Sequence, residues 1–281
     1  LGSGLLDGDH SQGALPTYKA MDRAIKMAKK TGIAAIGITN SSHFGPAGAY
    51  TLHAAKKDMI GLAFCNSDSF VRLYDGAERF HGTNPISMAV PSGEQDPWLF
   101  DMATSSVPFN RVELFRSLDQ KLPLDVASDE SGNSTQDPHI AEMLDPLGAK
   151  FGFKGAGLGG ISEIFSAVLT GMKLSPELLP MSGPDMTTPR ELGAFVMAID
   201  PEGFVGSFLF KEGMQRYLSL LRNSTAKEKS LVMAPGDREW KIARQRDKNG
   251  VVLDPVTSDQ FRLLAERFGI SSKFDLWSDY D

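Results

Sequence analysis

Apolar residues recur every three or four positions between residues 17 and 30, a spacing that predicts an amphipathic helix ended by Gly32. Uninterrupted apolar runs at residues 33–38 and 60–64 predict two buried strands, with a second helix at 47–57 between them. The first 66 residues therefore alternate helix and strand, which is typical of an α/β domain. This alternation alone favours a doubly wound parallel sheet.

The pattern becomes less regular in the middle of the chain. Two short apolar runs flank a turn that contains Pro and Gly, and they predict strands at 86–90 and 98–100. Polar residues and turn formers dominate residues 117–147, so we expect mostly loop there. The remaining apolar patterns predict a helix at 158–170, a strand at 194–199, a helix at 208–221 and a helix at 260–268 that Thr257 or Ser258 would cap.

Composition and charge narrow the function classes. The 281 residues carry a formal net charge of -6 and no long basic block, so we expect no nucleic-acid partner. The single cysteine, Cys65, excludes an intrachain disulfide and fits a reducing compartment. No signal peptide is visible, and the sequence contains no apolar run of about 18 residues. We therefore expect a cytoplasmic protein without a membrane span, and no residue pattern requires a metal.

His43 stands in a loop that follows the first predicted strand. Loops at the carboxyl ends of strands bind ligands in open α/β sheets, and an imidazole exchanges a proton near neutral pH. A histidine in this position can equally well bond the backbone of the turn. Spacing alone favours this structural interpretation over a catalytic one.

Residues 152–160 contain five glycines and open a predicted helix, with Lys154 near its start. The N-terminus of a helix attracts anions, and the lysine adds a fixed positive charge for a phosphate. The P-loop pattern is not met, and a glycine-rich helix can also simply pack closely against a neighbour. Both interpretations stay open at this point.

Three further polar turns could bind a nucleotide. Residues 67–69 and 101–105 each follow a predicted strand, and residues 235–239 precede a predicted helix. Carboxylates and hydroxyls in such turns can hold ribose. The alternative is that they cap helices, with Asp101 or Thr104 as the cap of the helix that follows.

Taken together, these segments resemble the malate/L-lactate dehydrogenase family of the second, non-Rossmann type. That family includes ureidoglycolate and sulfolactate dehydrogenases and cyclic imino-acid reductases. The resemblance covers about residues 5 to 270, and its most specific motifs are GTNP at 82–85 and DMATS at 101–105. It also rests on Asp7–His10, Asn40–Tyr50, Lys154–Leu158, Ala198–Pro201 and Pro235–Asp237.

The resemblance implies an α/β fold with a mixed, mostly antiparallel sheet flanked by helices, in place of the parallel sheet that alternation favours. It implies one oxidoreductase domain over residues 1–281 and a homodimer. It also implies hydride transfer between NAD or NADP and C2 of a small 2-hydroxy, 2-oxo or 2-imino acid, with His43 as acid/base. The cofactor contacts that it implies are Ser67, Asp101, Met102, Ala103, Lys154, Gly155, Gly236, Asp237 and Arg238.

Three departures from the family pattern leave an alternative open. Family members carry tens of residues before the Asp7–His10 motif, and these contribute ligands of the substrate, so we expect half of the substrate site to be missing here. Ala156 replaces the family's aromatic residue beside the cofactor, and Asn110 and Arg111 replace Gly-Lys. The alternative is a nucleotide-binding remnant of the same family with impaired catalysis. A kinase-like or regulatory phosphate-binding module is disfavoured, because the GK[ST], HRD and DFG motifs are absent.

Overall fold

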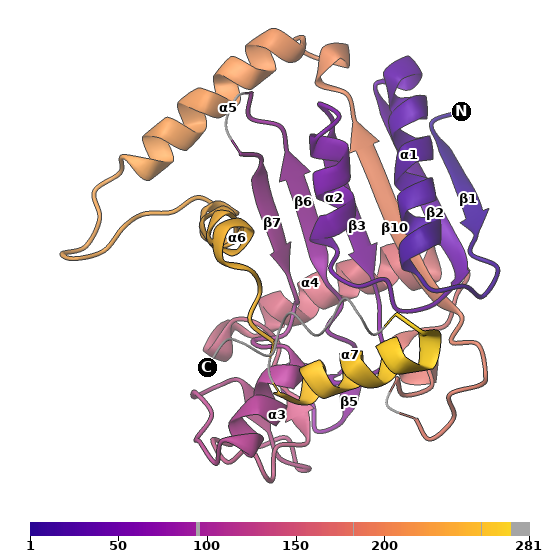
Figure 1. Ribbon diagram of the computed structural model, residues 1–281, viewed down its shortest axis with the longest axis vertical. Helices are drawn as coiled ribbons and strands as arrows, with labels where there is room; N and C mark the ends of the chain where they lie inside the picture. The colour runs from indigo at the N-terminus through magenta and orange to yellow at the C-terminus, as the bar shows by residue number, and fades with distance from the viewer. Residues whose placement is uncertain (94–95, 182, 254, 271–281) are drawn as a thin grey trace. The chain divides into compact units, whose positions relative to one another are not determined.

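A six-stranded sheet with the order β1-β2-β10-β3-β6-β7 organises the first part of the chain in the computed structural model (Figure 1). Of the described strands in this sheet, β1 and β2 run parallel and every other neighbouring pair is antiparallel. The strands are β1 (Ser3–Asp7), β2 (Ile33–Ser41), β10 (Leu192–Ile199), β3 (Ile60–Cys65), β6 (Ile86–Val90) and β7 (Trp98–Met102). The mixed, mostly antiparallel sheet is confirmed, and the doubly wound parallel sheet that alternation favours is wrong.

The structure describes residues 1–93, 96–181, 183–253 and 255–270. By its internal contacts the chain divides into two compact units, Leu1–Gly236 and Asp237–Asp281. The second unit contains α6 (Asp237–Asn249) and α7 (Pro255–Phe268). No helix in the described ranges is long and apolar enough to cross a membrane.

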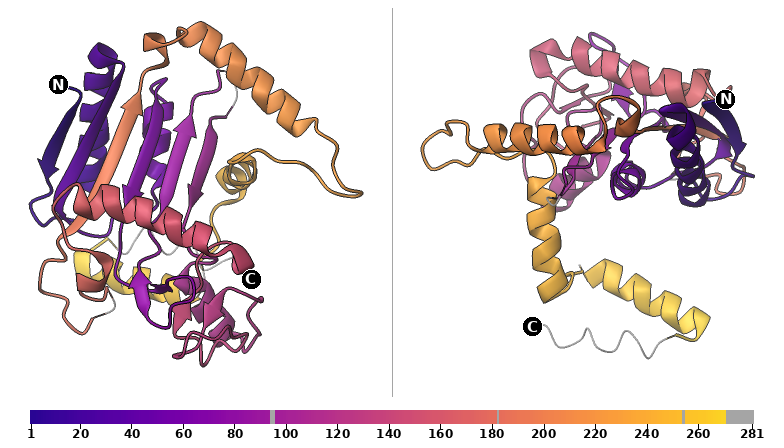
Figure 2. Two further views of the ribbon diagram at one scale, coloured as in Figure 1. Left: turned by 180° about the vertical axis from the view of Figure 1, so that it is seen from behind. Right: turned by 90° about the horizontal axis from the view of Figure 1, so that it is seen from above.

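The helices of the first unit lie on both faces of the sheet. Helices α1 (Ala14–Thr31) and α2 (Gly48–Ala55) cover one face, and α4 (Phe153–Glu163) crosses the other (Figure 2). A π-helical segment, Ile164–Val168, continues α4, and its Phe165 stacks on Phe64 of β3 with ring centroids 5.0 Å apart. This unit also contains α5 (Ser207–Arg222) and the 3-10 turns Ala149–Phe151, Ser175–Glu177 and Pro201–Gly203.

A second, smaller sheet packs with α3 (Phe109–Ser117) around its own apolar cluster. Its strand order is β5-β4-β9-β8. The strands are β4 (Val71–Arg72), β5 (Arg79–His81), β8 (Ala127–Ser128) and β9 (Met143–Leu144). Two of these short strands lie in residues 117–147, which are otherwise loop as the polar composition predicts.

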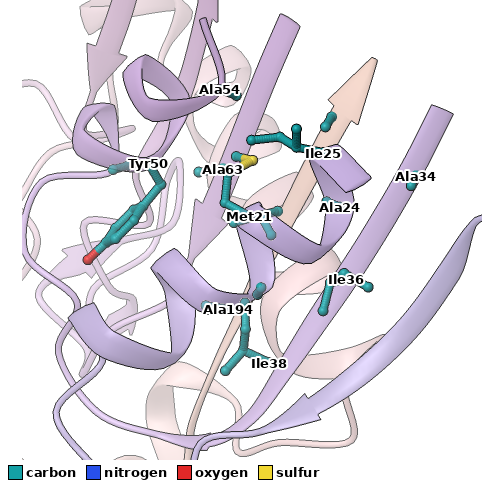
Figure 3. Packing of buried hydrophobic residues seen from close by; sticks show 14 of the residues in the cluster. Met21, Ala24, Ile25, Ala34, Ile36, Ile38, Tyr50, Ala54, Ala63 and Ala194 are labelled. Carbon is teal, nitrogen blue, oxygen red and sulfur yellow. The ribbon is translucent and has the colours of Figure 1, made fainter. Parts of the chain in front are cut away.

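The main core lies between α1, α2 and the sheet (Figure 3). Met21 and Ile25 of α1 pack against Ile36 and Ile38 of β2, and all four are buried. Alanines occupy many of the remaining contact positions, which lets the helices approach the strands closely. The period of 3.6 in α1 and the continuous apolar run of β2 thus arise from one shared interface.

Several element boundaries differ from the sequence-based expectation. Helix α4 begins at Phe153 rather than at residue 158. Strand β1 was not predicted, because it is an edge strand whose residues are mostly exposed. Helix α7 begins at Pro255, so Thr257 and Ser258 lie inside the helix instead of capping it. The end of α1 at Gly32, which has φ of 77°, is confirmed.

Gly193 in β10 lies where the sheet closely approaches the π-helical segment Ile164–Val168. A Cβ atom there would lie 1.6 Å from the carbonyl oxygen of Ser166. We expect Gly193→Ala to lower the free energy of unfolding by about 1–3 kcal/mol, since the layers would have to separate. Chemical denaturation measures this loss. Gly4→Ala in edge strand β1 is the control, because its new methyl would only touch Ile36 Cδ1 at 3.5 Å. Equal stability of the two variants would contradict the packing account.

Candidate active site

The strand register brings several of the segments that resemble the family motifs to one edge of the large sheet. Strand β10 starts where β2 ends, and it pairs there with the end of β3 as well. Strand β6 starts between the ends of β3 and β7. We call this the site edge, the lower end of the sheet in Figure 1, formed by Asp7, Ser41, Cys65, Ile86, Met102 and Leu192.

His43 lies exposed in the loop that follows β2 at the site edge. The backbone N–H of Gly45 donates to His43 Nδ1 at 3.2 Å, and the N–H of Gly13 donates to the His43 carbonyl at 3.2 Å. The first bond places the proton of the neutral ring on Nε2. The turn-bonding interpretation is therefore confirmed for Nδ1. Nε2 has no hydrogen-bond partner within the part of the chain that the structure describes.

Two buried aromatic residues fix the loop that carries His43. The Tyr50 hydroxyl of α2 donates to the carbonyl of Phe44, and the two rings lie 5.1 Å apart. Burial raises the pKa of Tyr50 above its usual range, so the hydroxyl stays a donor. Gly45 has φ of 75°, a left-handed conformation that glycine adopts readily, which permits the sharp turn beside the imidazole.

The loop after β1 lies beside the His43 loop. The N–H of Gly8 donates to Thr39 at 2.8 Å, and the N–H of His10 donates to Asn40 at 2.9 Å. Asp7 accepts hydrogen bonds from the Asp9 backbone and the Asn40 amide, and these bonds lower the pKa of its carboxyl. A carboxylate and a second histidine, His10, thus join the site edge. The Asp7–His10 motif is recognisable in the sequence, but no local pattern places it next to His43.

Ser67 follows β3 and is tied to the GTNP segment that precedes β6. The Thr83 N–H donates to Ser67 Oγ at 3.2 Å. A Cβ atom at Gly82 would lie 2.2 Å from the same Oγ, so glycine is needed there for the contact. The hydroxyl of Ser67 is therefore held in place by a neighbouring strand connection.

Asp101 caps a helix, but not the one that follows it. Its Oδ2 accepts from the backbone N–H of Gly48 at 2.8 Å, and Gly48 is the first residue of α2. Helix α3 begins at Phe109 without a side-chain cap, so the expectation that Asp101 or Thr104 caps the following helix is wrong. The carboxylate reaches across 53 positions because β7 ends beside the start of α2. Such a cap is invisible to local sequence patterns.

Met102 and Ala103 follow Asp101 at the site edge and are half-buried. The next residue, Thr104, is buried, and its Oγ donates to the Thr83 and Asn84 carbonyls, each at 3.2 Å. The DMATS segment therefore lies against the GTNP segment. These two are the most specific motifs of the family resemblance.

Lys154 and Gly155 form the first turn of α4. Gly155 packs so closely that its Cβ would lie 2.2 Å from the Leu147 carbonyl, and the Leu147 N–H donates to the Thr104 carbonyl at 3.0 Å. This chain of contacts fixes the start of α4 beside the DMATS segment. Lys154 is exposed, with Nζ 5.2 Å from the centre of the Phe151 ring. The first turn holds no acidic residue and no side-chain cap.

The late loop reaches the outer strand of the sheet rather than the site edge itself. The Pro235 carbonyl accepts from the Leu99 N–H at 3.1 Å, in the first half of β7. Gly236 is buried with φ of 96°. Asp237 and Arg238 are the first residues of α6 and belong to the second compact unit. The predicted helix after this turn is confirmed.

Comparison with known proteins identifies the family. A family model described as malate/L-lactate dehydrogenase matches residues 2–262. The chain belongs to the malate/L-lactate dehydrogenase family.

Its relatives in this family are dehydrogenases of several acids. Malate/(S)-sulfolactate dehydrogenase of Methanothermus fervidus is 32% identical over 268 residues, which cover 95% of this chain and 76% of the relative. Ureidoglycolate dehydrogenase (NAD(+)) of Escherichia coli O157:H7 is 31% identical, with coverage of 90% and 72%. (2R)-3-sulfolactate dehydrogenase (NADP(+)) of Chromohalobacter salexigens is 29% identical, with coverage of 92% and 75%.

Solved structures of the family share the fold. Malate dehydrogenase from Entamoeba histolytica superposes with a TM-score of 0.89 at 29% identity, covering 96% of this chain and 78% of that one. Sulfolactate dehydrogenase from Methanocaldococcus jannaschii gives a TM-score of 0.88 at 30% identity, with coverage of 96% and 77%.

The cap between Asp101 and α2 gives a testable consequence for this family member. We expect Asp101→Ala to lower the free energy of unfolding by about 1 kcal/mol, because the Gly48 N–H loses its acceptor. Asp101→Asn keeps an acceptor oxygen and should lose less. Thermal unfolding of both variants tests this order. An unchanged free energy of unfolding for Asp101→Ala would show that the carboxylate contact contributes nothing to stability.

Proposed function

We propose that this chain is an NAD(P)-dependent oxidoreductase that acts at C2 of a small 2-hydroxy, 2-oxo or 2-imino acid, with His43 as the acid/base. The observation that carries the proposal is the position of His43 in the loop after β2, at the same sheet edge as Ser67 and the 101–103 segment. The names of the relatives support a hydroxy-acid substrate, and they include both NAD(+) and NADP(+) enzymes.

The residues at the site edge fit a dinucleotide. Lys154 and the uncapped first turn of α4 offer positive charge to phosphate. A Cβ atom added at Gly157 or Gly160 of α4 would meet no atom within 4 Å, so the backbone of this helix is open to close approach. Ser67 and Asp101 supply hydroxyl and carboxylate groups of the kind that bind ribose. We propose that Met102, Ala103 and Gly155 contact the same cofactor. Gly236, Asp237 and Arg238 remain proposed cofactor contacts that rest on the family resemblance.

When bound, the nicotinamide cofactor supplies or accepts the hydride at substrate C2. His43 handles the accompanying proton. In the reducing direction the imidazolium donates its Nε2 proton to the oxygen or nitrogen on C2, and in the oxidising direction the neutral ring accepts it.

The Gly45 contact constrains this proton transfer. While Nδ1 accepts from the Gly45 N–H, the neutral ring keeps its proton on Nε2 and cannot accept another there. Proton uptake at Nε2 requires Nδ1 to become the protonated nitrogen. The ring must therefore release Gly45 and turn toward another acceptor during the catalytic cycle. The glycine backbone and the exposed position of His43 permit this movement.

We further propose a homodimer. Helix α5 exposes large apolar side chains, including Phe208 and Leu220. Exposed apolar surfaces of this kind mark protein contacts. Sedimentation of the purified chain tests this, and a monomer at all concentrations would contradict it.

Substitution of His43 tests the assignment of the acid/base. We expect His43→Asn to reduce kcat by about 10²–10⁴-fold, because general acid–base help is lost. Cofactor affinity should stay within about twofold, since the imidazole acts on the substrate. Steady-state kinetics and cofactor titration measure both quantities. Unchanged turnover would rule out the assignment.

Substitution of Lys154 tests the phosphate contact. We expect Lys154→Ala to raise the cofactor Kd about three- to tenfold, equivalent to about 1 kcal/mol for an exposed ion pair. Lys30→Ala is the matched control, because Lys30 is also exposed and lies in the last turn of α1, near the opposite edge of the sheet. Nicotinamide fluorescence measures both. Equal affinities of the two variants would remove Lys154 from the site, and saturable binding without turnover of any acid would favour the remnant alternative.

A further inference from the structure

A buried carboxylate in α4 is not part of the site described above. Glu163 is 6% exposed and accepts four hydrogen bonds. Asn84 Nδ2 and Ser175 Oγ donate at 2.7 Å, the Ser175 N–H at 2.6 Å and Asn66 Nδ2 at 3.3 Å. Within the described residues, no lysine or arginine pairs with it. The amide N–H groups and the hydroxyl therefore stabilise the buried carboxylate.

Two of these donors lie next to proposed cofactor contacts. Asn66 directly precedes Ser67, and Asn84 lies in the GTNP segment whose backbone holds both Ser67 and Thr104. Asn84 has φ of 36°, a left-handed conformation that needs support from its surroundings. Its Nδ2 meets Glu163 and also the Gly159 carbonyl at 3.0 Å.

The side chain of Asn66 is held in a conformation that carries a free-energy cost. It is 1% exposed, and its Oδ1 has no partner among the described protein atoms. A buried acceptor without a partner costs about 1–3 kcal/mol. Bonds from Nδ2 to Glu163 and to the Lys173 carbonyl at 2.9 Å offset this cost. The amide orientation thus depends on Glu163.

Glu163 also connects these loops to the phosphate-binding turn. It lies nine positions after Lys154 on the same helix, about 14 Å along the axis. A rigid helix therefore relates Lys154 to the loops that carry Ser67 and Thr104.

We propose that Glu163 is a positioning residue for the cofactor pocket: through Asn66 and Asn84 it sets Ser67 and the GTNP–DMATS backbone at a fixed distance from Lys154. This inference rests on the proposed function. All four partners donate a hydrogen bond to Glu163, which suits an ionised carboxylate because it can only accept. A side-chain amide of the same size would turn an N–H toward at least one donor.

The test is Glu163→Gln in the full chain, with NADH and NADPH titrated by nicotinamide fluorescence. We expect the cofactor Kd to rise about tenfold or more, while kcat at saturating cofactor stays within about threefold, because His43 is outside this network. Glu177→Gln is the control. That carboxylate accepts from the Leu174 N–H at 2.8 Å in the same region but contacts neither Asn66 nor Asn84. It should leave Kd unchanged.

Two further variants separate positioning from general stability. Val196→Ala weakens the buried core on the α1 face and should lower the melting temperature without changing Kd. Asn66→Ala keeps the carboxylate and removes the link to Ser67, so it should raise Kd even if Glu163→Gln does not fold.

Four outcomes would overturn the proposal. The first is a folded Glu163→Gln with wild-type Kd. The second is a rise in the Kd of Glu163→Gln no larger than that of Val196→Ala. The third is an unchanged Kd for Asn66→Ala. The fourth is a wild-type chain that binds neither cofactor, which would remove the proposed function and the positioning role together. The first three leave wild-type binding intact and so overturn the positioning role alone.

Discussion

Antiparallel pairing around β10 is the constraint on which the rest of the structure depends. This strand comes from residues 192–199, yet it lies between β2 and β3 and pairs with both over most of its length. The loop with His43 and the loop with Ser67 become neighbours across β10 because both strands end where it begins. The antiparallel β6 and β7 add the GTNP and DMATS segments at that same edge. The placement of these four segments at one edge follows from strand order and direction, and no local motif determines it.

Close backbone approaches maintain this arrangement. Glycines at 82 and 155 lie where a side chain would overlap a neighbouring segment, and each joins two parts of the site edge. Hydrogen bonds from Thr83 to Ser67 and from Gly48 to Asp101 connect segments far apart in the sequence. The glycines and hydroxyls of these motifs therefore serve contacts between loops.

The sequence predicted the elements of the main layer and much less of their arrangement. The apolar pattern predicts helix α1 and the strands β2, β3, β6 and β10, because each of these elements has a buried face. The glycine at position 32 predicts the end of α1. The strand order did not follow, since alternation of helix and strand is compatible with parallel and antiparallel sheets alike. The family resemblance supplied the correct sheet.

The candidate site shows the same division. His43 and Lys154 were recognisable from residue type and loop position. The cap from Asp101 to α2 and the contacts of Glu163 with Asn66 and Asn84 were not. The cap joins positions 53 apart, and the two contacts join positions 97 and 79 apart, which only the fold brings together. Their side chains are also common types without a distinctive spacing, so no sequence signal marks them.

Hydrogen–deuterium exchange of the whole chain, with and without saturating NADH or NADPH, tests the central claim most directly. If the site edge holds the cofactor, amides at 66–69, 82–85, 101–105 and 152–156 exchange more slowly with one of the two cofactors, while those at 55–59 and 199–203 near the opposite edge do not change. Protection confined to the opposite edge, or no protection anywhere at saturation, would contradict the account.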